Sequence, residues 1–378
     1  MTINIENITL RHVKIPLLSP FRTSFGTQTD KDCILVEMKN SEGLSGWSEI
    51  PVTINPGYTY ETIKTAWHIA EDFLIPSLVK NKPKDGFETY DQFMNSFKPV
   101  RGHNLAKAGF EIAYWVMKAE QENKTLGEII GSKNRPVPSG VSIGIQKNVN
   151  DLIKRINFFL DQHYQRIKIK IEPGYDVDVI KQLRSELDPK MPLMVDANSA
   201  YSLHDINHLK QLDQFNLMMI EQPLDYLDII DHIKLQKEME TPICLDESIH
   251  SFEDARKALD ASACRIINIK VTRVGGLMES KKIAEYVQKN DQWQAWCGGM
   301  LETGIGRMVN VYLQTLPGFT LPGDTSGSDR YFEKDLIDPP VVVKKGFIHP
   351  PNNGSGLSVE INEDFIKKIT QKELSFKI

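Results

Sequence analysis

Five charged residues recur at nearly constant spacing through the middle of the chain. Lys170, Asp196, Glu221, Asp246 and Lys270 are separated by 26, 25, 25 and 24 residues, and each follows directly on a short apolar run. A parallel strand and its crossover helix together occupy a length of this order. We therefore expect the five side chains at the carboxyl ends of five consecutive parallel strands, converging on one site.

The three acids of this series indicate a metal site. Carboxylates from Asp196, Glu221 and Asp246 would repel one another and raise one another's pKa unless a cation lay among them. A ligand set made only of oxygen, without His or Cys, favours Mg2+ over Zn2+ and leaves positions for water and substrate oxygens. A single acid at a strand end can equally be a solvated charge, but five charged residues in register argue against that interpretation. We expect Mg2+ here, with Mn2+ able to replace it.

The lysines at the two ends of the series are candidate acid–base groups. In a curved barrel, Lys170 and Lys270 would face each other across the mouth. A lysine acts as a base only if its pKa falls, which burial and nearby positive charge can cause. Lys168, the metal ion and Arg273 are candidates to supply that charge. The alternative is that the lysines only neutralise the acids, which would not explain their placement on opposite sides.

Strand-like runs alternate with helical patterns from Val137 to about Leu321, which predicts parallel strands joined by helical crossovers. The runs are VPSGVSIGI, RIKIKI, PLMVDAN, LMMIEQP, PICLDES, RIINIKV and QAWCGG, with residues 319–321 as the candidate eighth. About eight such units close a barrel whose active site lies at the carboxyl ends of its strands. The expected fold is α/β, a (β/α)8-type or modified TIM barrel.

The flanking regions predict a second, α+β unit. Residues 5–46 alternate apolar and polar side chains between turn signals, as antiparallel hairpins do, whereas residues 59–79 and 105–121 show helical spacing. The tail segment VVVKKGFIHPPNNGSGLSVEI returns to a hairpin-like pattern and is expected to rejoin the N-terminal sheet. We expect a capping domain over residues 1–134, a barrel over 135–322, and a segment over 323–378 that returns to the capping domain.

Composition narrows the class of protein. The chain has 378 residues, of which 40% are hydrophobic and 25% charged, as expected for a globular protein with two folding units. It contains no run of about 18 apolar residues and no secretory signal pattern, so we expect a cytoplasmic protein that does not enter a membrane. The net charge of −5 argues against a general affinity for nucleic acid. Small molecules are the expected partners.

An ordered set of short motifs, spread over nearly the full chain, resembles the enolase superfamily. Within it, the muconate-lactonising-enzyme-like branch and its o-succinylbenzoate synthase / N-succinylamino acid racemase group are the most similar. The motifs are Lys168-x-Lys170, Asp196-Ala197-Asn198, Glu221-Gln222-Pro223, Asp246-Glu247-Ser248, Asn268-Ile269-Lys270 and Gly298-Gly299-Met300-Leu301-Glu302-Thr303-Gly304-Ile305-Gly306. Any one tripeptide is weak, but the ordered set is specific.

The resemblance implies a role for each site residue. It makes Asp196, Glu221 and Asp246 the Mg2+ ligands, and Lys170 a general base that can return its proton. Lys270 would face the substrate from the opposite side, and Lys168 would support Lys170. Residues implied to bind substrate or support the site are Asn198, Arg273, Gly299 and Met300 in the barrel, and Ser19, Phe25 and Tyr58 in the closing loops of the cap. The resemblance further implies a homo-oligomer acting on a small-molecule carboxylate.

The reaction implied by the resemblance is removal of a proton next to a carboxylate. The expected activity is Mg2+-dependent dehydration of 2-succinyl-6-hydroxy-2,4-cyclohexadiene-1-carboxylate in menaquinone biosynthesis, with N-succinylamino acid racemisation as a possible second activity. Alternatives are a dipeptide epimerase, a cycloisomerase or a catalytically silent binding relative. The intact acids and lysines argue against the silent relative. The segment Cys297-Gly298-Gly299-Met300 lacks the Asp-x-Asp motif of dipeptide epimerases, which favours the first reaction.

Overall fold

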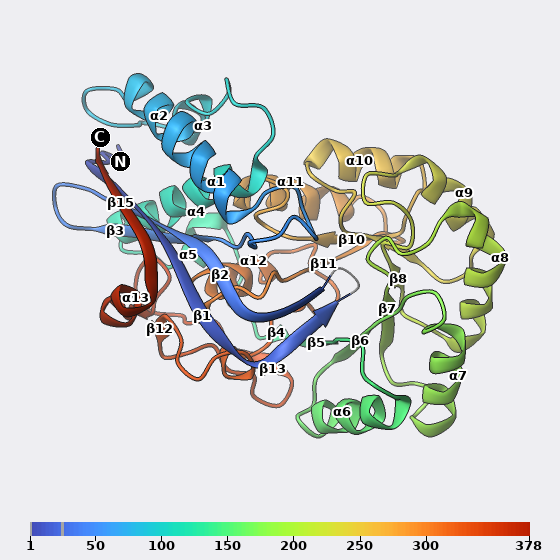
Figure 1. Ribbon diagram of the computed structural model, residues 1–378. Coiled ribbons are helices and arrows are strands. Elements are labelled where there is room, and N and C mark those ends of the chain that lie inside the picture. The colour runs from blue at the N-terminus through green and yellow to red at the C-terminus, as the bar shows by residue number, and fades with distance from the viewer. Residues whose placement is uncertain (1, 24–25) are drawn as a thin grey trace.

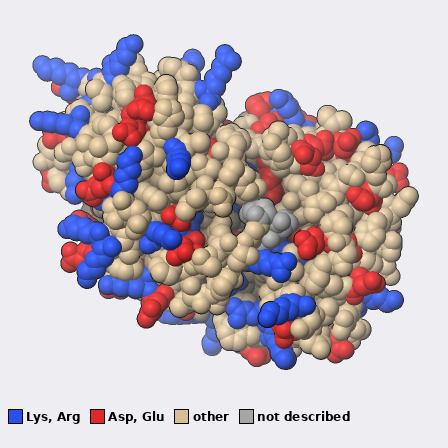
Figure 2. All heavy atoms as spheres, in the orientation of Figure 1, with Lys and Arg blue, Asp and Glu red and all other residues tan. Residues whose placement is uncertain are grey.

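The computed structural model describes residues 2–23 and 26–378, which form a cap and a barrel (Figure 1). The cap contains the N-terminal strands and also the last strand of the chain, so both termini lie close together. On the face drawn in Figure 2, basic and acidic side chains are interspersed over both parts. Among the described residues, no helix combines the length and the apolar character that crossing a membrane requires.

The cap is built on an antiparallel sheet in the order β15-β1-β2-β3. One side of this sheet is apolar, because alternate residues such as Ile8, Leu10, Ile34 and Val36 are fully buried. Its strands are β1 (Asn7–Thr23), β2 (Gly26–Lys39), β3 (Ser45–Ile50) and β15 (Thr370–Lys377). Its helices are α1 (Ile63–Ile69), the π-helix η1 (Ala70–Leu74), α2 (Ile75–Asn81), α3 (Tyr90–Asn95), α4 (Asn104–Gln121) and α5 (Leu126–Ile130).

The barrel contains seven parallel strands in the order β11-β10-β9-β8-β7-β6-β5, each within one of the runs expected from the sequence. These strands are β5 (Gly140–Ile143), β6 (Arg166–Lys170), β7 (Leu193–Asp196), β8 (Ile220–Glu221), β9 (Ile243–Leu245), β10 (Ile266–Ile269) and β11 (Gln294–Cys297). The connecting helices are α6 (Val149–Asp161), α7 (Val177–Glu186), α8 (Ile206–Leu209) between the 3-10 turns η2 (Leu203–Asp205) and η3 (Lys210–Phe215), α9 (Ile230–Glu238), α10 (Phe252–Asp260) and α11 (Leu277–Val287). The predicted α/β barrel is therefore confirmed.

An irregular segment, residues 319–324, takes the place of the eighth strand. Phe319 forms a parallel bridge with Ala295 beside β11, and Gly323 forms one with Ser139 beside β5. Asp324 N–H donates to the carbonyl of Cys297 at 2.9 Å, which ties the segment to the end of β11. The barrel is thus closed by single bridges at the expected position. Gly323 and Asp324, which lie beyond the expected barrel limit, belong to its wall.

The C-terminal tail differs in part from the expectation. The hairpin-like segment 341–361 does not join the N-terminal sheet. It contributes β13 (Phe347–Ile348), which pairs with β4 (Val137–Pro138), and β14 (Glu360–Ile361), which pairs with β12 (Ile337–Asp338). Its Gly and Pro residues limit each pairing to two residues, because turns interrupt the ladder. After α13 (Glu363–Ile369), β15 supplies the return to the cap by pairing with β1.

Buried polar contacts fix the cap to the barrel. Glu111 on α4 accepts hydrogen bonds from the N–H groups of Leu277 (2.9 Å) and Met278 (3.1 Å) at the start of α11. This carboxylate compensates unpaired N–H groups at a helix N-terminus. Glu49 at the end of β3 accepts from Thr303 N–H at 2.9 Å, immediately before α12 (Gly304–Gln314). In Figure 1 the β1–β2 hairpin runs from the cap toward the barrel, and its residues Phe21 and Gln28 line a cavity together with Ser142.

Candidate active site

The five evenly spaced residues lie at one mouth of the barrel. Lys170, Asp196 and Glu221 end β6, β7 and β8, and the strand register places Lys170 beside Asp196 and Asp196 beside Glu221. Asp246 and Lys270 follow directly on β9 and β10. All five side chains are buried, with residue exposures of 8% or less. The structure therefore brings together the residues that the spacing singled out.

Each acid of the trio is paired with a basic side chain. Lys168 Nζ lies 3.0 Å from Glu221 Oε2 and 3.3 Å from Asp196 Oδ2, and Lys170 Nζ lies 2.5 Å from Asp196 Oδ2. Asp246 contacts Lys270 at 2.9 Å and also Arg273. As they stand, no three His, Cys, Asp or Glu side chains of residues 2–23 and 26–378 surround a common point closely enough to hold an ion. The predicted ligands share one mouth, but basic groups lie among them.

The trio nevertheless fits a hard divalent cation by its chemistry. Its donors are carboxylate oxygens on three consecutive strands, buried where they can be compensated only by positive charge. Two neighbours already orient them: Asn268 Nδ2 donates to Glu221 Oε1 at 2.7 Å, and Asn198 N–H donates to Asp196 Oδ1 at 3.0 Å. Such partners fix the direction of a metal ligand. Next to Asp246, the buried Glu247 Oε2 has no hydrogen-bond partner among the described residues.

Burial and neighbouring charges shift the pKa values of the acids in opposite directions. Burial raises the pKa of Asp196, but Lys170 and Lys168 outweigh it and lower the pKa to about 2. Burial and the charge of Asp196 raise the pKa of Glu221. The same two causes raise the pKa of Glu247 to about 7. The charge of Asp196 thus disfavours the charged forms of Glu221 and Glu247, whereas two lysines compensate Asp196 itself.

The lysine pKa values differ from the expectation. Burial would lower the pKa of Lys168, but Asp324, Glu221 and Asp196 raise it above its ordinary value. For Lys270, burial is likewise outweighed by Tyr58, Glu247 and Glu221, and the pKa is raised. For Lys270, the expectation that positive neighbours would lower its pKa is therefore corrected. Acidic groups outnumber basic ones around each ammonium, and an acidic environment stabilises the charged form.

A cavity opens above the cluster between barrel and cap. Lys168, Lys170 and Lys270 line it, as do the predicted residues Asn198, Gly299, Met300 and Tyr58. Tyr58 brings the cap into contact with the barrel machinery. Its hydroxyl donates to Asp246 Oδ1 at 3.1 Å and accepts from Arg273 Nη1 at 2.9 Å, while Lys270 Nζ lies 4.0 Å from the centre of its ring.

Three other predicted residues have different positions. Ser19 is exposed on β1 and does not line the cavity, so its role in substrate binding stays a prediction. The strand carries Phe21 to the cavity instead, and the returning strand adds Gln28. Phe25 falls outside the described residues. Arg273 lies behind the cavity, where it contacts Asp246 and donates to the Ile249 carbonyl at 2.7 Å, so it supports the site rather than facing it.

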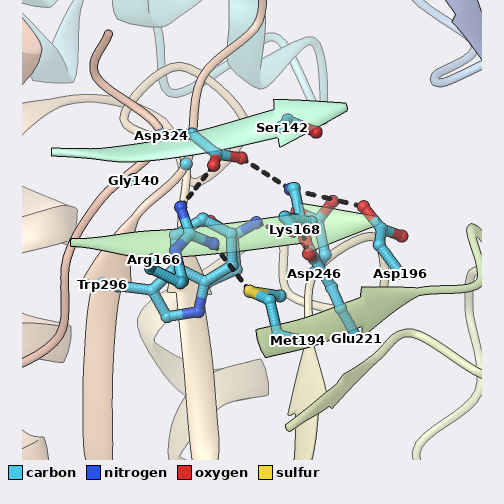
Figure 3. A network of polar contacts seen from close by, with 12 residues as sticks. Gly140, Ser142, Arg166, Lys168, Met194, Asp196, Glu221, Asp246, Trp296 and Asp324 are labelled. Carbon is cyan, nitrogen blue, oxygen red and sulfur yellow. Dashed lines mark hydrogen bonds and ion pairs between the residues drawn. The ribbon is translucent and has the colours of Figure 1, made fainter. Parts of the chain in front are cut away.

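Sequence reasoning missed a second group of residues at the mouth. The cavity is also lined by Ser142, Glu302, Arg307, Asp324 and Tyr331. Asp324 forms ion pairs with Lys168 at 2.6 Å and with the fully buried Arg166 (Figure 3). The rule that located the other charges, a charged residue at a strand's carboxyl end, applies to Asp324 as well. It was hidden because the segment that it ends has no regular strand pattern.

Comparison with known proteins agrees with this architecture. Residues 5–131 match the model of the mandelate racemase / muconate lactonizing enzyme N-terminal domain, and residues 151–365 match that of the enolase C-terminal domain-like family. An o-succinylbenzoate synthase of Geobacillus kaustophilus is 47% identical over 98% of this chain and 97% of its own, and one of Bacillus subtilis is 45% identical over 98% of each chain. An N-succinylamino acid racemase of Thermus thermophilus is 39% identical over 97% of each chain.

The solved structures give the same relationship. A member of the enolase superfamily from Listeria innocua superposes with a TM-score of 0.92 at 38% identity and covers 99% of both chains. The muconate lactonizing enzyme of Pseudomonas fluorescens has a TM-score of 0.90 at 20% identity over 98% of this chain and all of its own, which shows a common fold. With both of its domains matched and relatives similar over nearly its full length, the chain belongs to the muconate-lactonizing-enzyme-like branch of the enolase superfamily.

Proposed function

We propose that this enzyme is an o-succinylbenzoate synthase, which dehydrates 2-succinyl-6-hydroxy-2,4-cyclohexadiene-1-carboxylate in menaquinone biosynthesis. The observation that carries the proposal is that Lys170 and Lys270 line one cavity and pair with buried Asp196 and Asp246, while buried Glu221 lies beside Asp196. The full-length similarity to o-succinylbenzoate synthases selects this substrate among those of the superfamily.

We assign Asp196, Glu221 and Asp246 as the residues that would hold Mg2+, or Mn2+ in its place. The ion would supply a Lewis acid for the substrate carboxylate next to the carbon that loses its proton. For the acids to reach it, Lys168, Lys170, Lys270 and Arg273 must release part of their present contacts. The bound cation would then compensate the acids, and Lys168 and Lys270 would lose carboxylate neighbours that now raise their pKa values.

Lys170 is the proposed base. Its amine takes the proton from the carbon next to the carboxylate, and the resulting ammonium returns a proton to the departing hydroxyl. One C–H and one C–O bond break, the ring becomes aromatic, and water leaves. Lys270, at the other end of the acidic series, stabilises the negative charge that develops on the carboxylate. Hydrogen bonding to Asn198 at 2.5 Å orients Lys170.

Racemisation of N-succinylamino acids is the second proposed activity. It is favoured by the presence of lysines at both ends of the acid series, since one can remove the α-proton and the other can deliver a proton to the opposite face. The relatives named N-succinylamino acid racemase support this second reaction. A dipeptide epimerase is less well supported, because the segment Cys297-Gly298-Gly299-Met300 lacks the Asp-x-Asp motif of such enzymes.

The experiment is a pair of assays on the purified, metal-loaded enzyme, measuring kcat/KM for dehydration and for racemisation. We expect both activities to disappear in excess chelator and to return with Mg2+ or Mn2+. Full turnover after the metal content has been shown to be nil would contradict the metal assignment. Absence of dehydration by the loaded enzyme would contradict the principal function.

The remaining expectations from the sequence stay predictions. They are a cytoplasmic location, a homo-oligomeric state, and the domain limits 1–134, 135–322 and 323–378, with Gly323 and Asp324 now placed in the barrel wall. Cell fractionation, light scattering and limited proteolysis, respectively, measure them.

A further inference from the structure

Lys168 has three carboxylate partners, and the nearest one lies outside the proposed metal ligands. Its Nζ is 2.6 Å from Asp324 Oδ2, compared with 3.0 Å from Glu221 and 3.3 Å from Asp196. Figure 3 shows Asp324 reaching Lys168 from the β5 side of the barrel, opposite the acids of β7 and β8. Lys168 therefore lies between two acidic groups and contacts both.

Asp324 is itself firmly held. Arg166 pairs with its other oxygen, and the Asp324 backbone N–H donates to Cys297. Arg166 is fully buried in the barrel and stacks on Trp296, with 4.5 Å between the guanidinium carbon and the ring centroid. The strand beside it has no room for a side chain, since a Cβ on Gly140 would lie 2.4 Å from Arg166 Nη2. Asp324 is thus a fixed anchor whose Oδ2 stays beside the Lys168 ammonium.

The position of Lys168 affects metal binding directly. The Lys168 Nζ group forms ion pairs with oxygens of Asp196 and Glu221, and a divalent cation would need the same oxygens as ligands. If Lys168 had no other partner, it would compete with the cation for these oxygens, because an unpaired buried ammonium is unfavourable. An anchored carboxylate on its far side removes that cost and allows Lys168 to withdraw.

We propose that Asp324, fixed by Arg166, is a positioning residue that draws Lys168 away from Asp196 and Glu221 and so leaves their oxygens to the cation. The inference rests on the proposed function, from which it takes the metal site. The proposal gives a function to the buried Arg166–Asp324 ion pair inside the barrel. It also gives Lys168 a role in metal binding in addition to its expected support of Lys170.

The test is Mn2+ affinity, measured from the electron paramagnetic resonance signal of free Mn2+ without any substrate. Asp324→Asn is expected to bind Mn2+ about 10- to 100-fold more weakly than the wild type, the range typical for residues that orient metal ligands. Asp176→Asn is the matched control, because Asp176 is a buried barrel carboxylate bound by Tyr201 and His208 at 2.8 Å each, outside the cavity lining. It should retain wild-type affinity.

Two further variants test whether the loss of Mn2+ affinity comes from the position of Lys168 or from misfolding or the changed charge. Arg166→Met/Asp324→Asn removes both charges together, leaves no unpaired guanidinium, and should lose as much affinity as Asp324→Asn. In a Lys168→Met background, Asp324→Asn should have almost no further effect, because the side chain through which it acts is gone. Equal losses with and without Lys168, or wild-type affinity in both Asp324 variants, would overturn the inference. Failure of the wild type to bind Mn2+ would instead contradict the proposed metal site.

Discussion

The two sides of the barrel mouth are built differently. The side from β6 to β10 carries Lys170, three acids and Lys270 at strand ends, one per repeating unit. The opposite side, from β11 through residues 319–331, carries Met300 on a loop, Arg307 on α12 and Asp324 on one irregular segment. On the first side the charged residues recur once per strand, whereas on the second they are scattered over a helix and irregular segments and include the anchor for Lys168.

This difference suggests a division of labour. Parallel strands in register place their terminal side chains reproducibly, so groups that must act together on one proton benefit from that framework. Loops can vary in length and composition without disturbing the barrel, which suits contacts that select a substrate. We therefore expect substitutions on the β6–β10 side to reduce kcat and those on the loop side to change mainly KM.

The largest effect is expected for the acids of the β6–β10 side. Asp196→Asn, Glu221→Gln and Asp246→Asn should each lower kcat/KM for dehydration by roughly 10^4-fold, because the loss of Lewis-acid stabilisation costs several kcal/mol. Circular dichroism should show that the fold is kept, since the rim of a barrel is its functional end. Near wild-type rates in all three variants would show that the chemistry lies elsewhere.

Lys170 and Lys270 should come next, with losses of about 10^2- to 10^4-fold typical for a general acid–base group. Lys170→Ala should lower dehydration toward the upper end of this range, because the proposed base is lost, whereas Lys270→Ala should weaken it less, through lost charge stabilisation. Deuterium exchange of D- and L-N-succinylamino acids in D2O measures proton exchange by Lys170 and by Lys270 separately. Each single variant should still exchange one enantiomer without interconverting the pair. Two-way racemisation without Lys270 would contradict the two-base scheme.

Arg273→Gln should have an intermediate effect, about 10- to 100-fold, as expected for a residue behind the active groups. Arg273 shares Asp246 with Lys270 and donates to Tyr58, whose ring lies on Lys270. Without the guanidinium, Asp246 would hold the Lys270 ammonium more strongly and leave less free amine. Exchange by Lys270 should fall more than exchange by Lys170, and racemisation more than dehydration. Equal losses would indicate a purely structural role.

On the loop side, Met300→Ala should raise KM by about fivefold with little change in kcat. Met300 lines the cavity, and truncation removes apolar contact area that binds substrate without taking part in proton transfer. Steady-state kinetics for both substrate classes measure the changes in KM and in kcat. If kcat fell as much as for the lysine variants, the proposed division between the two sides of the mouth would fail.

The smallest effect on activity is expected far from the mouth, at Glu111. Burial raises its pKa from 4.5 to about 7, so the folded protein holds this proton more tightly than the unfolded chain. Its contribution to stability is present below the unfolded pKa and is lost as pH rises through about 7, a change of up to roughly 3 kcal/mol. Glu111→Gln should flatten the fall in unfolding free energy between pH 4.5 and 7 while leaving kcat/KM almost unchanged. Urea unfolding of both proteins at several pH values measures how the free energy of unfolding depends on pH.

The sequence by itself determined the barrel and the central part of the site. Alternating strand and helix patterns located all seven regular strands, and the even spacing of Lys170, Asp196, Glu221, Asp246 and Lys270 placed them at one mouth. Both predictions succeeded for the same reason: a repeating β/α unit converts a distance along the chain into a position in space.

The tertiary structure alone decided the features that have no repeat. Asp324 reaches Lys168 because residues 319–324 are held by single bridges to β5 and β11, and Arg166 points into the barrel because Gly140 leaves space. In the cap, a long hairpin directs Phe21 rather than Ser19 to the cavity, which depends on where the sheet lies over the barrel. These positions follow from packing between segments far apart in the chain, and local patterns do not encode such long-range contacts.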